Sequence, residues 1–184
     1  NRGFAAGNNQ GLAAARGEYL VLLNNDTEVT QGWMGTLVNH LRRNPDLGIV
    51  GPVTDNIGNE AKISLRYKNG DEMQRKARGY TLAHMGELRL MHTLAFFCVM
   101  FPRSVYEHVG PLDEAFGLGF FEDDDYCRRI EQAGWRIMCA EDVFVHHHLS
   151  ASFGKLGKER GELLKMNRKI YEAKWGPWFP HKYR

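Results

Sequence analysis

The sequence has few cysteines and lacks any apolar run that is long enough to cross a membrane. Its three cysteines, Cys98, Cys127 and Cys139, are odd in number and lie in apolar or helical surroundings. This usage is typical of free thiols in a reducing compartment and argues against a disulfide framework. A membrane-spanning helix needs roughly 18 apolar residues in succession, and no stretch reaches that length. We therefore expect a cytoplasmic protein.

The sequence also lacks an excess of either charge. It has 24 Lys and Arg residues against 22 Asp and Glu residues, which gives a net charge of +2. Such a balance does not require a nucleic-acid or membrane partner, and we expect no binding to nucleic acid. Basic residues gather between residues 155 and 184. The simplest interpretation is a solvated face, and the alternative is attraction to a diphosphate or to anionic lipid at the inner face of the cell membrane.

The chain is long enough for one domain with a substantial core, since 43% of its 184 residues are hydrophobic. Five apolar residues at Tyr19–Leu23 follow one another without alternation, which predicts a strand covered on both faces, as in a parallel sheet. A second strand is expected at Leu47–Val53, after a helix that Thr30 would cap. This alternation of strands and helices predicts an α/β fold with a mainly parallel sheet and flanking helices.

The other expected elements are shorter or less regular. Residues 54 to 87 are polar and weakly periodic, which favours a mobile loop. The remaining predicted helices cover residues 8–16, 103–109, 124–133 and 161–173, and the remaining predicted strands cover residues 94–101, 135–140 and 143–146. We assign residues 1–154 to one domain and residues 155–184 to its C-terminal amphipathic helix and basic tail.

Asn24, Asn25 and Asp26 directly follow the first predicted strand. In open parallel sheets, ligands collect beyond the carboxyl ends of the strands, so Asp26 stands where a ligand is expected. A hard divalent cation takes oxygen ligands of this kind and completes its shell with phosphate oxygens and water. The alternative is an Asx turn that only satisfies local backbone groups. Asn24 is neutral, so it either contributes a weak ligand or binds a sugar or ribose hydroxyl.

Four acidic residues, Glu122, Asp123, Asp124 and Asp125, open a predicted helix. One or two acids in a first helical turn would be explained by capping and by the helix dipole. Four adjacent carboxylates repel one another, and such local conflicts concentrate at functional sites. Residues on a helix diverge by about 100° per step, so these acids cannot all face one substrate. One of them is therefore a candidate general base, while its neighbours cap, coordinate or bind.

Three consecutive histidines, His146 to His148, follow the last predicted strand. They could belong to an ordinary loop. However, at least one of three successive side chains must point into whatever site the strand faces. Because imidazole can complete a carboxylate-poor metal shell, one of these histidines is a candidate metal ligand.

Five motifs in the sequence together resemble those of family 2 glycosyltransferases. They are Asn1-Arg2-Gly3-Phe4-Ala5-Ala6-Gly7-Asn8-Asn9, Leu22-Leu23-Asn24-Asn25-Asp26-Thr27, Gly110-Pro111-Leu112-Asp113-Glu114-Ala115-Phe116, Phe121-Glu122-Asp123-Asp124-Asp125 and His146-His147. The resemblance covers nearly the whole chain. It is strongest to the rhamnosyltransferase-like members that build bacterial surface polysaccharide.

The resemblance implies a GT-A fold and an inverting transfer from a nucleotide-diphosphate sugar, such as a UDP- or dTDP-sugar, to a glycan or lipid-linked acceptor. It implies Mn²⁺ or Mg²⁺ held by Asp26, with Asn24 and Asn25 beside it in the cofactor site. Asp123 matches the family's base, with Glu122 and Asp125 as its catalytic neighbours. His147 matches the metal-proximal histidine when Ser150-Ala151-Ser152-Phe153 is aligned with the family's serines, and His146 is the neighbouring choice.

Two features separate this sequence from the family pattern. Asn24 replaces the first Asp of the family's Asp-x-Asp motif, and the two N-terminal strands that grip the base and ribose are not present. The chain is therefore expected to lack the first βα units and to leave an open sheet edge. It should then self-associate or be poorly stable, and bind nucleotide sugar more weakly than a version extended upstream. Two other functions are compatible with the same residues: a nucleotide-sugar hydrolase, and a non-catalytic module that binds glycan or a protein partner.

Overall fold

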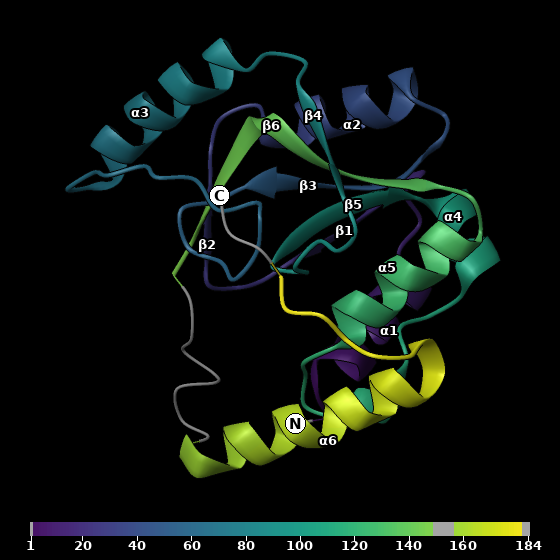
Figure 1. The fold of residues 1–184 in the computed structure, drawn as a ribbon. Helices are drawn as coiled ribbons and strands as arrows, with labels where there is room; N and C mark the ends of the chain where they lie inside the picture. The colour runs from purple at the N-terminus through teal and green to yellow at the C-terminus, as the bar shows by residue number, and fades with distance from the viewer. Residues whose placement is uncertain (1, 149–156, 182–184) are drawn as a thin grey trace.

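The structure is a computed structural model that describes residues 2–148 and 157–181. Figure 1 shows a twisted central sheet with helices on both sides. In chain order the elements are α1 (Phe4–Ala14), β1 (Tyr19–Leu23), β2 (Thr27–Val29), α2 (Trp33–Arg43), β3 (Leu47–Val53), α3 (Gly70–Ala83), β4 (Leu88–Met91), β5 (Cys98–Pro102), α4 (Arg103–Val109), the 3-10 helix η1 (Glu114–Phe116), α5 (Glu122–Gln132), β6 (Arg136–His147) and α6 (Gly157–Trp175). The prediction of a mixed α/β fold with flanking helices is confirmed.

The sheet has six strands in the order β1-β5-β3-β6-β2, and β4 pairs with β6. Strands β1 and β3 are both antiparallel to β5, and β6 is parallel to β3. Consequently β1, β3 and β6 run in one direction, while β5 runs between them in the other. The short strands β2 and β4 are both antiparallel to β6. Within the described ranges, β3 and β6 are therefore the one pair of adjacent parallel strands.

Helices cover both faces of the sheet. Successive side chains of β6 point to opposite faces, and they belong to two different hydrophobic clusters. Leu37 and Leu41 of α2 share a cluster with Met138. Ile130 of α5 shares the other cluster with Ile137, the residue next to Met138. Helices α2 and α5 therefore lie on opposite sides of the strand that ends at the candidate histidines.

Strand β1 lies where the sequence predicted it, but only one of its faces is well covered. Leu20 and Leu22 are buried, whereas Leu23 is 43% exposed. In the described sheet β1 is the end strand and pairs only with β5. Its uninterrupted apolar sequence therefore wrongly predicted a strand that is covered on both faces.

Several predicted helix boundaries are wrong. Helix α1 begins at Phe4 because Ala5 and Ala6 extend its buried face toward the N-terminus. The segment from 54 to 87 is not simply a loop: it contains α3, which Asn69 caps by accepting a hydrogen bond from the Glu72 N–H at 2.9 Å. Thr30 does not cap α2, since its hydroxyl donates to the Phe144 carbonyl at 2.6 Å.

The C-terminal half is more regular than predicted. The two strands expected between residues 135 and 146 form one strand, β6, and the predicted strand over 94–101 begins only at Cys98. Helix α6 extends beyond the predicted helix at both ends, and its Tyr171 packs with Phe116 and Phe121. None of the helices in the described ranges is long and apolar enough to cross a membrane.

Candidate active site

Asp26 and His147 lie together at one end of the sheet. Asp26 is in the turn between β1 and β2, and antiparallel pairing sets Thr27 opposite His147 near the end of β6. The His147 Nε2 atom is 3.4 Å from a carboxylate oxygen of Asp26. The backbone is fixed as well, because the His148 N–H donates to the Asp26 carbonyl at 2.9 Å. The structure thus brings together the two residues that the sequence nominated first for a metal.

The surroundings of His147 suit a metal ligand. Burial lowers the pKa of His147, although the charge of Asp26 works in the opposite direction, so the ring is neutral at neutral pH. Its face stacks on the Phe97 ring with centroids 4.9 Å apart, and its Nδ1 atom is buried with no hydrogen-bond partner among the described residues. One carboxylate and one neutral imidazole fit a divalent ion that takes the rest of its shell from diphosphate oxygens and water.

His146 faces other partners. Its Nδ1 atom lies 2.8 Å and 3.0 Å from the two carboxylate oxygens of Asp55, and the Tyr67 hydroxyl donates to the same carboxylate at 2.5 Å. Successive residues in a strand point to opposite sides, so His146 and His147 cannot both face Asp26. The structure places only His147 there. Ser150 to Phe153, which supported this register in the sequence, lie outside the described residues.

Asn24 and Asn25 form the turn that carries Asp26. The Asn24 N–H donates to the Phe97 carbonyl at 2.8 Å, and the Asn24 carbonyl accepts the Thr27 hydroxyl at 2.7 Å. Asn24 is partly buried, whereas Asn25 is exposed. The backbone of Asn24 therefore connects β1, the turn and the segment that stacks on His147.

Within the described ranges, no group of three or more His, Cys, Asp or Glu side chains is arranged to hold a metal ion. Among the described residues, Asp26 and His147 are the pair of candidate ligands that the sequence proposed and the structure brings together. Two ligands are enough for an ion that also binds phosphate groups of a substrate, because Mg²⁺ in particular is usually bound by one or two carboxylates plus phosphates.

The acidic cluster occupies the first turn of α5. The Asp123 carboxylate accepts the Asp124 N–H at 2.9 Å. Asp124 is held from two other segments, by the Thr93 hydroxyl at 3.1 Å and by His181 Nε2 at 3.3 Å. Burial and the neighbouring charges of Asp124 and Glu122 raise the pKa of Asp123 well above its usual range. A raised pKa strengthens a carboxylate as a base, provided that it is deprotonated at the working pH.

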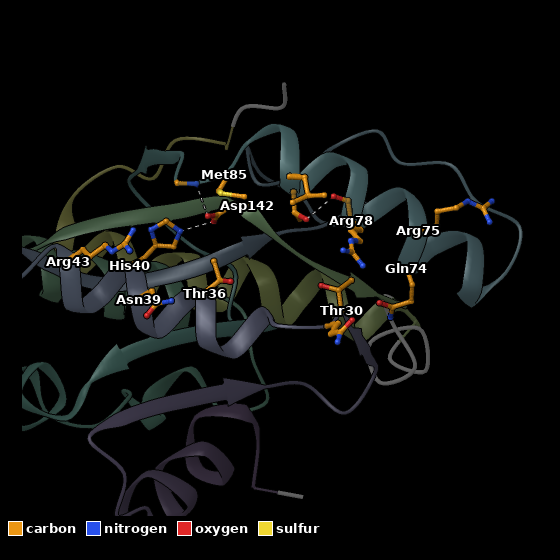
Figure 2. A pocket seen from close by; sticks show the side chains of 14 residues that line it. Thr30, Thr36, Asn39, His40, Arg43, Gln74, Arg75, Arg78, Met85 and Asp142 are labelled. Carbon is orange, nitrogen blue, oxygen red and sulfur yellow. Dashed lines mark hydrogen bonds and ion pairs between the residues drawn. The ribbon is translucent and has the colours of Figure 1, made fainter.

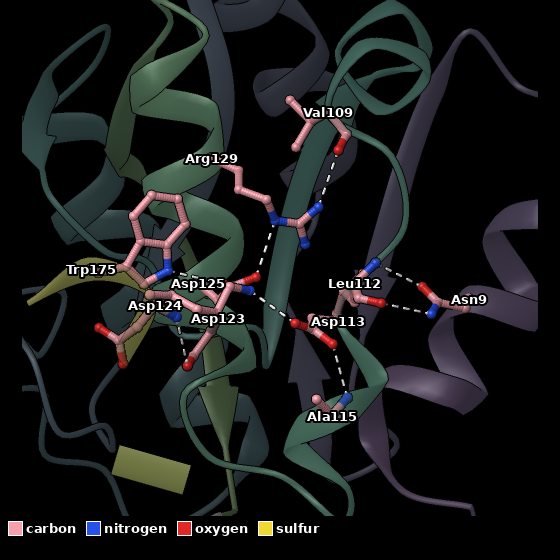
Figure 3. A network of polar contacts seen from close by, with 11 residues as sticks. Asn9, Val109, Leu112, Asp113, Ala115, Asp123, Asp124, Asp125, Arg129 and Trp175 are labelled. Carbon is pink, nitrogen blue, oxygen red and sulfur yellow. Dashed lines mark hydrogen bonds and ion pairs between the residues drawn. The ribbon is translucent and has the colours of Figure 1, made fainter. Parts of the chain in front are cut away.

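Asp125, a predicted catalytic neighbour, is instead directed toward α6. Figure 3 shows its fully buried carboxylate accepting hydrogen bonds from Trp175 Nε1 at 2.9 Å and Arg129 Nε at 3.0 Å. Lys174 also pairs with Asp125, and with Asp113 at 2.8 Å. These contacts give Asp125 a role in holding α5 against α6, and they favour Asp123 or Asp124 as the group that faces a substrate.

A short connecting segment, residues 93–97, joins the two halves of the site. Thr93 bonds to Asp124, and the Leu94 N–H donates to Cys127 Sγ of α5 at 3.4 Å. At the other end of the segment, Phe97 stacks on His147 and accepts the Asn24 N–H. Five residues therefore connect the acidic cluster to the Asp26–His147 pair.

The acidic cluster is preceded by strained backbone. Phe120 and Phe121 both have φ of 73°, a left-handed conformation that costs about 1–3 kcal/mol for each non-glycine residue. Asn167 of α6 is fully buried, and its amide donates to the carbonyls of Phe116 at 2.6 Å, Gly119 at 2.7 Å and Phe120 at 3.2 Å. Helix α6 thus holds the loop that presents the acids.

Two of the sequence motifs meet beside this loop. The Asn9 amide donates to the Leu112 carbonyl at 2.9 Å and accepts the Leu112 N–H at 2.9 Å, as Figure 3 shows. Asp113 then caps η1 by accepting the Ala115 N–H at 2.9 Å. The first and third motifs of the family resemblance therefore fix the approach to the acidic cluster.

Several residues of this region are not among those predicted from the sequence. Asp55 and Asn56 follow β3 as Asp26 follows β1, so the same strand-end argument could have identified them. Asn56 donates to the His147 carbonyl at 3.2 Å. By contrast, the apolar segment 93–97 reads as part of a strand, and His181 lies far away in the sequence. Nothing in the local sequence marks either of these as part of the site.

The buried carboxyl group of Glu122 makes the stability of the fold depend on pH. Burial, with the charge of Asp124, raises the pKa of Glu122 to about 7, and its Oε2 atom is buried without a partner in the described ranges. The unfolded chain releases this proton near pH 4.5, so folded-state stability falls as pH rises from about 4.5 to 7 and stays reduced above that. We expect Glu122→Gln to raise the free energy of unfolding by about 2–3 kcal/mol at pH 8 and by little at pH 5. Urea unfolding at both pH values measures this, and an equal effect at both would contradict it.

Solved structures with this architecture define the fold. The chain aligns with GalNAc-T7 in complex with UDP, GalNAc and Mn²⁺ at a TM-score of 0.59 and 15% identity, over 79% of this chain and 30% of that one. It aligns with the mannosyltransferase PcManGT from Pyrobaculum calidifontis, in complex with GDP-Man and Mn²⁺, at a TM-score of 0.52 and 17% identity, over 97% of this chain and 56% of that one. The fold is that of a GT-A glycosyltransferase.

The chain belongs to glycosyltransferase family 2, because the family model described as "Glycosyl transferase family 2" matches residues 1–110. The matched part includes Asn24 to Asp26 and ends before the acidic cluster. Among curated relatives, the chain is 29% identical over a 160-residue alignment to the O-antigen biosynthesis protein RfbC of Myxococcus xanthus. The alignment covers 81% of this chain and 12% of that protein. The chain is 28% identical over a 151-residue alignment to the pre-mycofactocin glycosyltransferase of Mycobacterium tuberculosis, and that alignment covers 80% of this chain and 30% of that protein. The chain therefore spans less than a third of the length of either relative.

Proposed function

We propose that this chain transfers a sugar, with inversion, from a nucleotide-diphosphate sugar to a hydroxyl of a glycan or lipid-linked acceptor. The observation that carries the proposal is the Asp26–His147 pair, joined through residues 93–97 to a buried acidic cluster. Family membership supports the reaction class. The nucleotides in the related structures support a UDP- or GDP-type donor, which extends the UDP- or dTDP-sugar expected from the sequence. The RfbC relative supports a role in surface polysaccharide synthesis.

In this mechanism Asp26 and His147 would hold Mn²⁺ or Mg²⁺. A bound divalent cation would neutralise the charge that develops on the leaving nucleotide diphosphate. Asp123 accepts the proton of the acceptor hydroxyl as that oxygen attacks the anomeric carbon from the face opposite the leaving group. Asn24 is available to bind a donor hydroxyl. Glu122 and Asp124 raise the basicity of Asp123, and Asp125 holds the helix in place.

The proposal predicts unequal effects of removing the two metal ligands. Asp26→Ala removes both a charge and a ligand, so we expect Mn²⁺-dependent nucleotide binding to be lost. His147→Ala should weaken that binding by about ten- to one hundred-fold, because water can replace a lost imidazole. Titration calorimetry with UDP, GDP and their sugars, with Mn²⁺ and with EDTA, measures both effects.

The matched control for this experiment is His146→Ala, which removes a neighbouring imidazole that faces Asp55. It should leave the Mn²⁺ dependence of nucleotide binding within a few-fold of the unsubstituted protein. Full retention of Mn²⁺-dependent binding by both Asp26→Ala and His147→Ala would exclude a metal from this site. Product analysis with and without a sugar acceptor separates transfer from hydrolysis, since a hydrolase releases free sugar at the same rate in both cases.

A further inference from the structure

The chain turns back on itself after α6. Gly176 ends the helix in a left-handed conformation with φ of 82°, and its N–H donates to the Glu172 carbonyl at 3.0 Å. Residues 176–181, which we call the C-terminal strap, then pass the end of α5 that carries the acidic cluster and run toward the sheet (Figure 1). The strap therefore reaches the acids from outside the helix that bears them.

Aromatic contacts fix the course of the strap. The Trp178 ring lies edge-on to the Phe121 ring with centroids 5.4 Å apart, and the Arg168 guanidinium lies over the Trp178 ring at 5.5 Å from its centroid. The Trp178 N–H also donates to a carboxylate oxygen of Glu172 at 3.1 Å. The rings of Trp178 and His181 are in contact, with centroids 5.6 Å apart. The packing of Trp178 on α6 and on the residue before α5 thus sets the position of His181.

His181 connects the strap to the acidic cluster. Its Nε2 atom lies 3.3 Å from a carboxylate oxygen of Asp124, and the two side chains are 28% and 10% exposed. The hydrogen bond to Asp124 raises the pKa of His181; burial opposes this rise, and the charges of Asp124 and Glu60 add to it. His181 therefore carries a positive charge over a wider pH range than an ordinary histidine does.

The acids that His181 meets repel one another. The Asp123 carboxylate accepts the Asp124 N–H, so the candidate base adjoins the partner of His181. Burial, followed by the charges of Asp124 and Glu122, raises the pKa of Asp123. Asp124 also accepts the Thr93 hydroxyl at 3.1 Å. Of these two partners of Asp124, only His181 can carry a charge that offsets the repulsion.

Another histidine–aspartate pair in the chain has a different setting. Figure 2 shows His40 and Asp142 in the lining of a cleft of about 820 Å³ between α2 and α3, with His40 Nε2 2.7 Å from an Asp142 oxygen. That pair connects α2 to β6, and no residue of the acidic cluster lines the cleft. A histidine–aspartate contact can therefore serve structure alone. What distinguishes His181 is that its partner adjoins the candidate base.

We propose that His181 is a positioning residue of the transfer site, which supplies a positive charge to Asp124 and so keeps Asp123 free of its proton during sugar transfer. This inference rests on the proposed function, because it takes Asp123 as the base. Two effects of the strap have opposite signs. Removing the charge of His181 would raise the pKa of Asp123, whereas opening the strap to water would lower it, since burial is the largest cause of the raised value.

His181→Gln tests the charge, because glutamine keeps a hydrogen-bond donor and loses the positive charge. We expect the pH range over which kcat/KM rises to move upward by about 1 pH unit. His181→Lys restores a cation and should recover most of this shift. Mn²⁺-dependent donor binding should be the same in all three proteins, because Asp26 and His147 are unchanged. Initial rates across the pH range, with calorimetric donor binding, measure these effects.

His92→Gln is the matched control. His92 Nδ1 lies 3.1 Å from a carboxylate oxygen of Glu131, which is also on α5, but the His92 side chain is 89% exposed. Its replacement should leave the pH profile in place. A shift of the His181→Gln profile to lower pH would show that the strap acts as cover alone. That result, an equal shift in His92→Gln, or the same shift in His181→Lys as in His181→Gln would overturn the proposal.

An NMR titration of the His181 imidazole separates this inference from the proposed function, since it needs no turnover. Asp124→Asn removes the charge of the partner, so the pKa of His181 should fall toward its ordinary value. An unchanged titration of His181 would overturn the inference, whatever the activity. If His181 responds but the unsubstituted protein transfers no sugar at any pH, the proposed function fails, and the role of His181 in transfer fails with it.

Discussion

Asp123→Asn should reduce the turnover number for sugar transfer by about 10² to 10⁴-fold, the range typical of a lost general base. The amide retains the size of the side chain and its hydrogen bond to the Asp124 N–H, but it cannot accept the acceptor proton. Mn²⁺-dependent donor binding should persist, because Asp26 and His147 are unchanged. Initial rates with saturating donor and acceptor, together with calorimetric donor binding, measure the two properties separately.

The pH dependence adds a second readout to this substitution. Because burial and the charges of Asp124 and Glu122 raise the pKa of Asp123, the base is deprotonated only above the usual range of an aspartate. We therefore expect kcat/KM of the unsubstituted protein to rise with pH through that higher range, and the residual activity of Asp123→Asn to lose this rise. Normal turnover by Asp123→Asn would transfer the role of base to Asp124.

Asp125→Asn is the control that separates catalysis from folding. Its carboxylate is buried between Arg129, Lys174 and Trp175, so removal of the charge leaves Arg129 without its carboxylate partner and Lys174 with Asp113 alone. Breaking a buried pair in this way typically costs about 3–5 kcal/mol. Asp125→Asn should therefore lower the thermal unfolding midpoint, whereas Asp123→Asn should not.

Asn167→Ala should lower both stability and turnover, although Asn167 lies on α6 and not on the helix of the acids. The substitution leaves three carbonyls without their donor, next to two residues in left-handed conformation. Each unsatisfied buried group costs about 1–3 kcal/mol, and some relaxation is expected, so we predict a loss of about 2–4 kcal/mol in the free energy of unfolding. The freed loop should then misplace the acids and lower kcat more than it raises the donor KM.

Asn167→Asp and Lys169→Ala make this prediction specific. Aspartate preserves the volume of asparagine but cannot donate hydrogen bonds, so it should be at least as harmful as alanine if the amide donors matter. Lys169 is exposed on the same helix, and its truncation should change neither stability nor kcat. If Asn167→Asp behaved like the unsubstituted protein, packing alone would explain the role of this residue.

The sequence predicted the parts of the fold that depend on local pattern. Strands at Tyr19–Leu23 and Leu47–Val53 are confirmed because short apolar runs between polar segments have few other stable conformations in a folded domain. Helix α3 was missed because its buried residues, Met73 and Ala77, are too few to give a clear helical period. The predicted start of α5, residue 124, is close to the observed start at Glu122, since the acidic residues themselves mark the first turn.

The candidate site was predictable where residues follow strands and unpredictable where partners come from distant segments. Asp26 and the histidines each follow or end a strand, so the sequence could propose that they share one end of the sheet. It could not choose between His146 and His147 from their own residue type, because strand register decides which of them faces Asp26. The contact of Asp124 with His181 joins residues that are far apart in the sequence, and no local pattern encodes it.

The clamp that Asn167 forms on the loop before α5 has a consequence for recombination between related enzymes. A chimera that exchanges only the C-terminal helix combines a helix from one enzyme with the loop before α5 from another. The new helix would need a side-chain amide at the position of Asn167 to donate to the carbonyls of that loop. A crossover placed before Phe116 carries the loop, the acids and the helix together. Chimeras with the crossover before Phe116 should keep the acidic cluster correctly placed. Chimeras that exchange only the C-terminal helix should fold with the acidic side chains displaced.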